Sequence, residues 1–261
     1  MSSRRGILLE ELGLAPVWRS RDCEMDQGKG GAVERASAEV IGISAPLPIS
    51  IRTSGAAGAD SDRPARIVRM DWPALKQSVE ACDACGLHKS RKKTVFGVGD
   101  ETADWLLIGE APGVEEDVRG EPFVGEAGLL LDNMIAAIGL ERGKNVYLSN
   151  ILKCSPPGNR NPDPGEVAQC RPYLSRQLAL IRPKLILAMG RFATQALLAT
   201  DANIVSLRGR VHTYQGVPVI VTYHPTYLLR TPADKFKAWE DLCLASKTMH
   251  GLLAGVQSPT D

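Results

Sequence analysis

Short apolar runs alternate with helical segments from Trp72 onward. Four runs rich in Val, Ile and Leu and bounded by Gly, Asn or Pro predict buried strands: residues 105–109, 146–152, 184–190 and 217–224. Helical spacing predicts helices at 126–139, 164–181 and 190–199, and a last helix over 232–253. This alternation indicates an α/β fold, with a four-stranded parallel sheet covered by helices on both faces.

A further helix is predicted before the first strand. It begins at Trp72, with Asp71 as N-cap and Pro73 in the first turn, and it leads to Cys82. Pro172 lies inside the segment 164–181 and predicts a new turn or a kink there.

Residues 1–66 differ in composition from the rest of the chain. Residues 4–19 predict a short helix around several leucines, and the Gly-, Ala-, Ser- and Pro-rich sequence after it cannot bury much apolar surface. We therefore divide the chain into an N-terminal helix with a flexible linker (1–66), a globular domain (67–255) and a tail (256–261).

Composition excludes some classes of protein and leaves others open. No uninterrupted apolar run approaches the length of a membrane span, so no membrane partner is expected. The start MSSRRGILLEELGLAP lacks the apolar core of a secretory signal, which predicts a cytoplasmic protein. The net charge of +1 carries no whole-protein signature of nucleic-acid binding, although a local basic patch can still bind DNA. Nothing indicates an obligate oligomer, and we expect a monomer.

Four of the six cysteines have the spacing of a metal site: Cys82-x2-Cys85, then Cys154-x15-Cys170. A C-x2-C pair presents two thiolates from one turn, the usual first half of a zinc or iron–sulfur site. Disulfides are disfavoured in the cytoplasm. Cys23 and Cys243 are interpreted as incidental, and spacing alone leaves zinc and iron open.

Polar side chains follow three of the predicted strands. Glu110 comes after the first strand, Asn150 ends the second, and His224 ends the fourth. Each alone has an ordinary explanation, as a turn residue or a satisfied polar group. Because ligands of open parallel sheets bind outside the carboxyl ends of the strands, the three together predict a site built from a carboxylate, a carboxamide and an imidazole.

The acidic segment after the first strand is not a phosphate loop. It lacks the Lys-Ser/Thr of a P-loop and the glycine spacing of a dinucleotide fingerprint. Glu110 is better suited to orient a water or to balance a developing positive charge. Glu115, Glu116 and Asp117 have the alternative role of favourable charge at a helix N-terminus, which we accept for Glu115.

Two features of the sequence each have two interpretations that the sequence alone does not separate. Phe123 either packs into the core or offers an aromatic face to a planar ligand. The basic run after the first cysteine pair is either a solvated loop or a set of phosphate contacts; it comprises Lys89, Arg91, Lys92 and Lys93.

These features together resemble the family 4 uracil-DNA glycosylases, the bacterial and archaeal type that carries a [4Fe-4S] cluster. The resemblance covers about residues 76–250. It rests on the cysteine spacing and on four segments: GEAPG at 109–113, GEPFVG at 120–125, NILKCSPPGNRNP at 150–162 and HPTYLLR at 224–230.

The resemblance implies a glycosylase-like three-layer fold and a monofunctional hydrolase that flips uracil from DNA and breaks its N-glycosidic bond, which starts base excision repair. It implies catalytic roles for Glu110, Asn150 and His224. Further roles follow position by position: substrate contact by Gly109, Ala111, Glu116, Phe123, Asn150, Asn159 and His224; DNA contact by Lys89, Arg91, Pro225, Leu228 and Arg230, with Leu228 or Leu229 as a wedge; and cluster ligation by Cys82, Cys85, Cys154 and Cys170.

Three alternatives remain to be separated from this hypothesis. A family 5-type glycosylase would accept a broader range of deaminated bases, although that family usually lacks a carboxylate at the position of Glu110. A redox iron–sulfur protein would need none of the three strand-end side chains. A zinc-stapled nucleic-acid binding module would bind DNA without regard to uracil.

Overall fold

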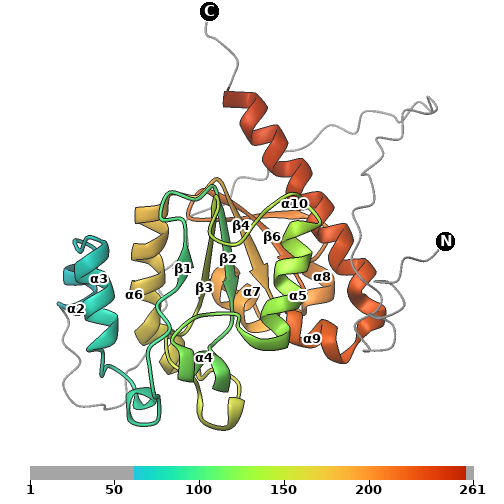
Figure 1. The fold of residues 1–261 in the computed structure, drawn as a ribbon. Coiled ribbons are helices and arrows are strands. Elements are labelled where there is room, and N and C mark those ends of the chain that lie inside the picture. The colour runs from blue at the N-terminus through green and yellow to red at the C-terminus, as the bar shows by residue number, and fades with distance from the viewer. Residues whose placement is uncertain (1–61, 257–261) are drawn as a thin grey trace, which may run out of the picture.

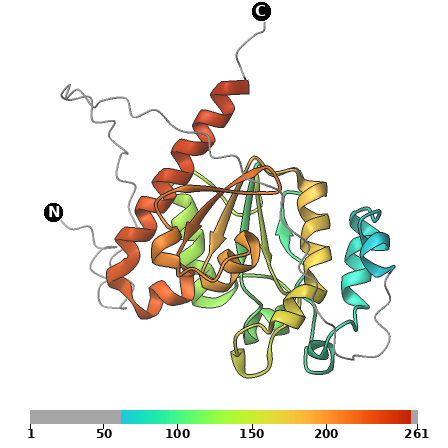
Figure 2. The same cartoon turned by 180° about the vertical axis from the view of Figure 1, so that it is seen from behind.

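A β-sheet lies between helices at the centre of the part of the chain that the structure describes (Figures 1 and 2). In the computed structural model, which describes residues 62–256, the strand order is β1-β3-β2-β4-β6-β5. The predicted four-stranded parallel sheet is therefore corrected to a six-stranded mixed sheet. Four central strands run parallel, and two edge strands are antiparallel to their neighbours: β2 (Trp105–Gly109), β3 (Val146–Asn150), β4 (Leu185–Met189) and β6 (Val217–Thr222) in the centre, β1 (Val98–Gly99) and β5 (Val211–Tyr214) at the edges.

The two edge strands carry little sequence signal. β1 has only two residues. β5 exposes two of its four residues, Val211 and Thr213, and has no continuous apolar run. The pattern that predicted the central strands depends on burial from both sides, which edge strands lack.

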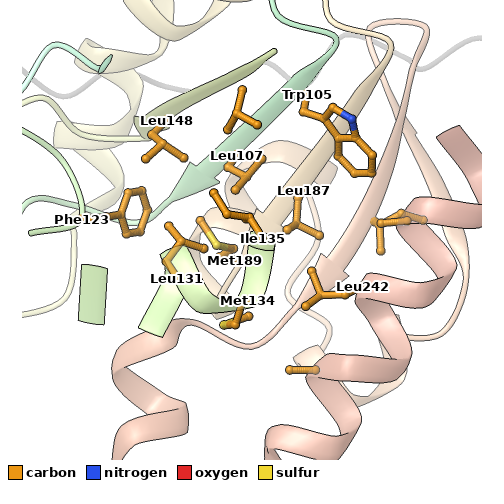
Figure 3. Packing of buried hydrophobic residues seen from close by; sticks show 14 of the residues in the cluster. Trp105, Leu107, Phe123, Leu131, Met134, Ile135, Leu148, Leu187, Met189 and Leu242 are labelled. Atoms are coloured by element: carbon orange, nitrogen blue, oxygen red, sulfur yellow. The ribbon is translucent and has the colours of Figure 1, made fainter. Parts of the chain in front are cut away.

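Helices cover both faces of the sheet, as the alternation predicted. On one face, α5 (Gly125–Ala136) and α10 (Lys235–Val256) pack against Leu107, Leu187 and their neighbours (Figure 3). On the other, α6 (Pro164–Ile181) and α7 (Arg191–Leu198) pack against Leu106 and Ile186. Every residue of the four central strands except Val217 and Pro218 is buried. Their apolar runs are continuous for that reason.

A further helical pair lies outside α6. α2 (Arg63–Ile67) and α3 (Trp72–Glu80) pack on it through a small core that includes Leu75 and Tyr173. The predicted cap of α3 is confirmed, since the Asp71 carboxylate accepts a hydrogen bond from the Ala74 amide at 3.0 Å. The prediction at Pro172 is wrong where it expected a new turn, because α6 continues as one helix through it.

Shorter helices form the rims of the sheet: α4 (Val114–Arg119), α8 (Ile204–Leu207), α9 (Pro225–Arg230), η1 (Gly86–Lys89), η2 (Pro157–Asn159) and η3 (Pro232–Asp234). The predicted helix at 4–19 and most of the linker lie outside the described residues. α2 crosses the boundary that we drew after residue 66. Within residues 62–256, no helix has the length and apolar character needed to cross a membrane.

Candidate active site

Strand register brings the first two predicted side chains together. Gly109 at the end of β2 pairs with Asn150 at the end of β3. The contact continues beyond the sheet, where the Ile151 amide donates to the Gly109 carbonyl at 3.0 Å and the Leu152 amide to the Glu110 carbonyl at 3.1 Å. Glu110 and Asn150 are therefore held as neighbours by backbone hydrogen bonds.

The predicted residues line one cavity of about 600 Å³ at the carboxyl edge of the sheet. Eight of them contribute to its wall: Glu110, Ala111, Glu116, Phe123, Asn150, Asn159, His224 and Arg230. Gly109 lies directly behind the wall. A Cβ atom at Gly109 would come within 2.5 Å of both the Asn150 carboxamide oxygen and the Phe123 ring, so only glycine allows these two side chains to approach.

Asn150 carries an unsatisfied acceptor at the cavity wall. The residue is 3% exposed, and its carboxamide oxygen has no hydrogen-bond partner among the described residues. A buried carboxamide oxygen without a partner costs about 1–3 kcal/mol. A ligand that donates a hydrogen bond to this oxygen would remove that cost.

His224 is the N-cap of α9, and its ring is oriented by that role. Its Nδ1 accepts a hydrogen bond from the Thr226 amide at 3.2 Å, so in the neutral ring the proton is on Nε2. Burial, and to a lesser degree the charge of Arg230, lower the pKa of His224 to about 4. The imidazole is therefore neutral at pH 7 and can act as a hydrogen-bond donor through Nε2.

Glu110 is a carboxyl group in an unfavourable place for charge. Burial raises its pKa to about 7, and the positive charge of Arg191 opposes that rise. A carboxyl group with a pKa near the operating pH is suited to general acid–base chemistry.

Phe123 belongs to both the core and the cavity, which resolves the choice left open by its sequence. The ring is 5% exposed, packs in the main apolar cluster, and lies 5.8 Å from the His224 ring between centroids (Figure 3). Its backbone has a positive φ of 55°. The Arg142 guanidinium stabilises this conformation by donating to the Phe123 carbonyl at 2.9 Å, while it pairs with Asp132 at 2.7 Å.

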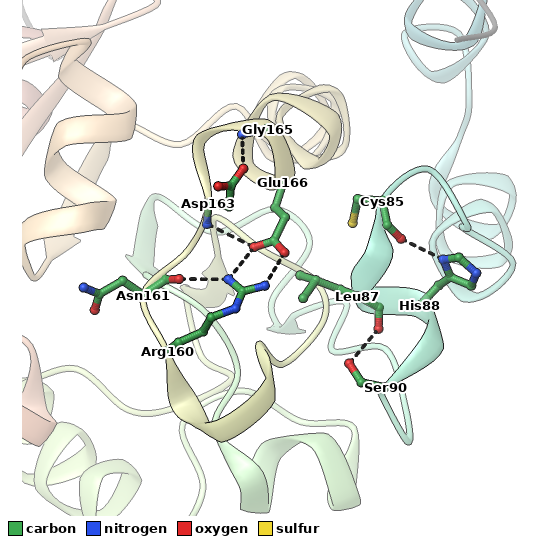
Figure 4. A network of polar contacts seen from close by, with 9 residues as sticks. All are labelled: Cys85, Leu87, His88, Ser90, Arg160, Asn161, Asp163, Gly165 and Glu166. Atoms are coloured by element: carbon green, nitrogen blue, oxygen red, sulfur yellow. Dashed lines mark hydrogen bonds and ion pairs between the residues drawn. The ribbon is translucent and has the colours of Figure 1, made fainter. Parts of the chain in front are cut away.

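Asn159 lies on an exposed loop at the rim of the cavity. The next residue, Arg160, forms an ion pair with Glu166 (Figure 4). The Arg160 guanidinium donates to both carboxylate oxygens of Glu166, at 3.0 and 2.5 Å. Glu166 also completes the capping box of α6 with Asp163. The start of α6 thus anchors the loop that carries Asn159.

The four predicted metal ligands come together at one place. Cys82, Cys85, Cys154 and Cys170 line a separate small pocket of about 20 Å³, and none of them is in a disulfide. No group of three or more His, Cys, Asp or Glu side chains within residues 62–256 has the arrangement of a single-ion site.

Hydrogen-bond donors favour the thiolate form at two of these sulfurs, whereas burial opposes it. The Arg91 guanidinium donates to the Cys154 sulfur at 3.2 Å, and the Lys153 amide to the Cys170 sulfur at 3.3 Å. Burial raises the pKa of Cys170 to about 12 and also raises that of Cys154. A bound cation would favour thiolates at these positions, and the presence and identity of a metal here stay a prediction.

Some predicted DNA contacts are not available at the surface. Of the two residues predicted as a wedge, Leu228 is 0% exposed and packs in the core, whereas Leu229 is 37% exposed; the wedge role itself stays a prediction. Pro225 is also buried, at the first turn of α9. The guanidinium of Arg91 turns inward to the Cys82 carbonyl at 2.8 Å and to the cysteine pocket. Lys89 and Arg230 are exposed.

Arg191, Phe192 and Tyr223 are among the cavity residues that the sequence analysis missed. Arg191 and Phe192 begin α7 directly after β4, and Tyr223 precedes His224. The strand-end argument could have found the first two, because they follow the third predicted strand. Tyr223 stacks on Tyr227 with ring centroids 4.9 Å apart, a contact that no spacing in the sequence indicates.

Comparison with known proteins gives a family match and several similar relatives. Residues 96–243 match the model of the uracil DNA glycosylase superfamily. The chain is 43% identical to a type-4 uracil-DNA glycosylase of Archaeoglobus fulgidus, over 65% of this chain and 92% of the relative. It is 39% identical to a type-4 enzyme of Pyrobaculum aerophilum, over 67% and 93%. A type-5 uracil-DNA glycosylase of Thermus thermophilus is 36% identical over 50% of this chain and 73% of the relative.

Proposed function

Because the chain belongs to the uracil DNA glycosylase superfamily, and within it to the type-4 uracil-DNA glycosylases, we propose that it starts base excision repair by hydrolysing the N-glycosidic bond of uracil flipped from DNA into the cavity at Asn150. One observation carries the proposal for the site: Asn150, whose buried carboxamide oxygen has no partner among the described residues, lines a cavity together with a neutral histidine.

The base is recognised by its hydrogen-bonding edge. Asn150 accepts from uracil N3–H and donates to O4, while cytosine presents the reverse pattern and would leave the carboxamide with unpaired groups. Phe123 stacks on the flipped base. Glu116, whose carboxylate accepts from the Val124 amide at 3.2 Å, lies against C5 and excludes the methyl group of thymine.

Hydrolysis then separates charge between the base and the sugar. Uracil leaves as an anion, and the Nε2–H of His224 stabilises the charge that develops on O2. Glu110 positions the attacking water and offsets positive charge on the sugar. Among residues 62–256 no lysine lines the cavity, so we expect no Schiff base and no cleavage of the strand.

The four cysteines hold a [4Fe-4S] cluster in this proposal. The cluster would cross-link the turn between α3 and η1, the segment after β3 and α6, which carry its ligands. The catalytic side chains lie in a separate cavity. We further propose that the protein acts as a monomer in the cytoplasm.

An excision assay tests the function. A labelled oligonucleotide with one uracil is incubated with the protein and then heated in alkali, which cleaves abasic sites. We expect cleavage after alkali and an intact strand without it. An intact strand after alkali, with cluster-loaded protein, would refute the glycosylase. Cleavage at hypoxanthine or xanthine would favour the broader family 5-type alternative, and the broad visible absorbance of iron–sulfur centres separates iron from zinc.

Glu110 predicts a pH dependence of the excision step. The carboxylate form is the active one, so with a pKa of about 7 the single-turnover rate should rise about tenfold between pH 6 and pH 8. Glu110→Gln should lower the rate and remove this rise, whereas the exposed Glu101→Gln should keep it. A pH profile that is unchanged in Glu110→Gln would remove Glu110 from the mechanism.

A basic hollow beside α4 predicts the path of the DNA backbone. It has a volume of about 670 Å³, and six basic side chains line it against two acidic ones, Glu80 and Glu121: Lys76, His88, Arg91, Lys92, Lys93 and Arg119. α4 separates this hollow from the uracil cavity, since Glu116 near its start lines the cavity and Arg119 at its end lines the hollow. Lys92 and Lys93 are exposed there and can bind phosphates.

The salt dependence of DNA binding tests this path. The logarithm of the binding constant falls with the logarithm of the salt concentration, and each lost phosphate contact reduces the steepness of that fall by about 0.9. Lys92→Ala/Lys93→Ala should therefore reduce the steepness by about 2. The control is Lys144→Ala/Lys184→Ala, at the amino ends of β3 and β4, which should leave the salt dependence unchanged. Equal slopes in both double variants would place the DNA elsewhere.

A further inference from the structure

Lys153 is a buried lysine that the proposed chemistry does not use. It is 1% exposed and comes three residues after Asn150. Its Nζ lies 2.6 Å from the Ser149 hydroxyl, 2.6 Å from the Gln177 side-chain oxygen and 3.0 Å from the Asn150 carbonyl. An ammonium group has three N–H donors and no acceptor, so these three oxygens satisfy it completely.

Placing an ammonium group here is costly. Removing a charge from water costs several kcal/mol even in well-arranged sites, and all three partners of Lys153 are neutral. A methionine of similar volume would fill the same space without that cost. The hydrogen bonds of the ammonium group fix the positions of the three oxygens that accept them.

The hydrogen bonds of Lys153 join the cysteine pocket to the uracil cavity. Its amide donates to the Cys170 sulfur at 3.3 Å, and its carbonyl accepts from the Val95 amide at 2.8 Å. Gln177 in turn donates to the Phe96 carbonyl at 2.9 Å. The side chain of Lys153 reaches back from this anchored segment to the carbonyl at the end of β3.

We propose that Lys153 is a positioning residue for Asn150, which sets the direction in which the Asn150 carboxamide enters the cavity. A hydrogen bond to the Asn150 carbonyl restrains rotation of the backbone at that residue, and this rotation moves the side chain. Lys153 itself is not part of the cavity wall. The inference rests on the proposed function, because it assumes that Asn150 pairs with the base.

Lys153→Met should weaken base recognition without affecting DNA binding. A displacement of about 1 Å in a positioned group can cost about 100-fold in rate, and we expect a loss of that size in single-turnover excision. Inhibition by free uracil should weaken as well. The affinity for DNA that contains an abasic site and the cluster absorbance per chain should stay at the wild-type values. Lys184→Met is the matched control and should change none of these.

A double-mutant cycle decides whether Lys153 acts through Asn150. In the Asn150→Ala background, Lys153→Met should lower the rate by less than about twofold, because the side chain that it positions is already gone. A further loss of about 100-fold in that background would overturn the inference. So would a wild-type rate in Lys153→Met with an intact Asn150.

A second variant covers the case in which Lys153→Met fails to fold. Gln177→Leu removes one acceptor of the ammonium group and lines no part of the cavity. It should show the same non-additivity with Asn150→Ala, and additive losses would overturn the inference. Wild-type protein on the same oligonucleotide tests the proposed function separately. An inactive wild type rejects both the glycosylase function and the role of Lys153. An active wild type with additive losses in the double-mutant cycle rejects only the role of Lys153.

Discussion

Asn150→Ala is expected to lower the single-turnover rate of uracil excision by about 1,000-fold. The substitution removes both hydrogen bonds to the base edge, and sites built to hydrogen-bond a polar substrate group discriminate by 10⁴-fold or more when that pairing fails. In the free protein the carboxamide oxygen is buried without a partner among the described residues. Activity should therefore fall while the melting temperature does not.

This combination separates a functional role of Asn150 from a structural one. Removing a buried polar group that stabilises the fold would lower both activity and melting temperature. Asn133→Ala, at an exposed position of α5, is the control and should keep the wild-type rate. A rate within tenfold of wild type in Asn150→Ala would exclude the carboxamide as the main reader of the base. Excision is measured under single-turnover conditions, so that product release does not mask the chemical step.

His224→Ala is expected to lower the same rate by about 100- to 1,000-fold. Removal of one donor that stabilises a developing anion typically costs about 3 kcal/mol, which corresponds to this range. The structure specifies the donor: Nδ1 accepts from the Thr226 amide, so Nε2 carries the proton. Because the pKa of His224 is lowered to about 4, its titration should not appear in the rate between pH 5 and pH 8.

The cluster absorbance provides the internal check for His224→Ala. It should remain at the wild-type value per chain, because the cysteine pocket and the uracil cavity have separate walls. His250→Ala, at an exposed position of α10, should leave the rate unchanged. Wild-type activity in His224→Ala would remove the imidazole from the mechanism. A change of the wild-type rate with pH near pH 6 that is absent in His224→Ala would show that the ring is charged during turnover.

The central strands and the long helices could be predicted because their signals are local. Burial of β2, β3 and β4 from both faces leaves continuous apolar runs, and the N-cap at Asp71 and the capping box at Asp163 mark helix starts. β1 and β5 could not be predicted in this way, because antiparallel pairing at an edge depends on the neighbouring strand and not on a pattern within the edge strand.

The candidate site likewise combines features that the sequence predicts with features that depend on tertiary packing. The sequence by itself determined which chemical groups stand at the strand ends, Glu110, Asn150 and His224, and which family they belong to. Only the tertiary structure decided which side chains face the cavity: it buries Leu228 and leaves Leu229 exposed, turns Arg91 inward, and adds Arg191 to the wall. Residue type and spacing are written along the chain, whereas burial, side-chain direction and the pKa values of Glu110 and His224 depend on what other segments pack around each group.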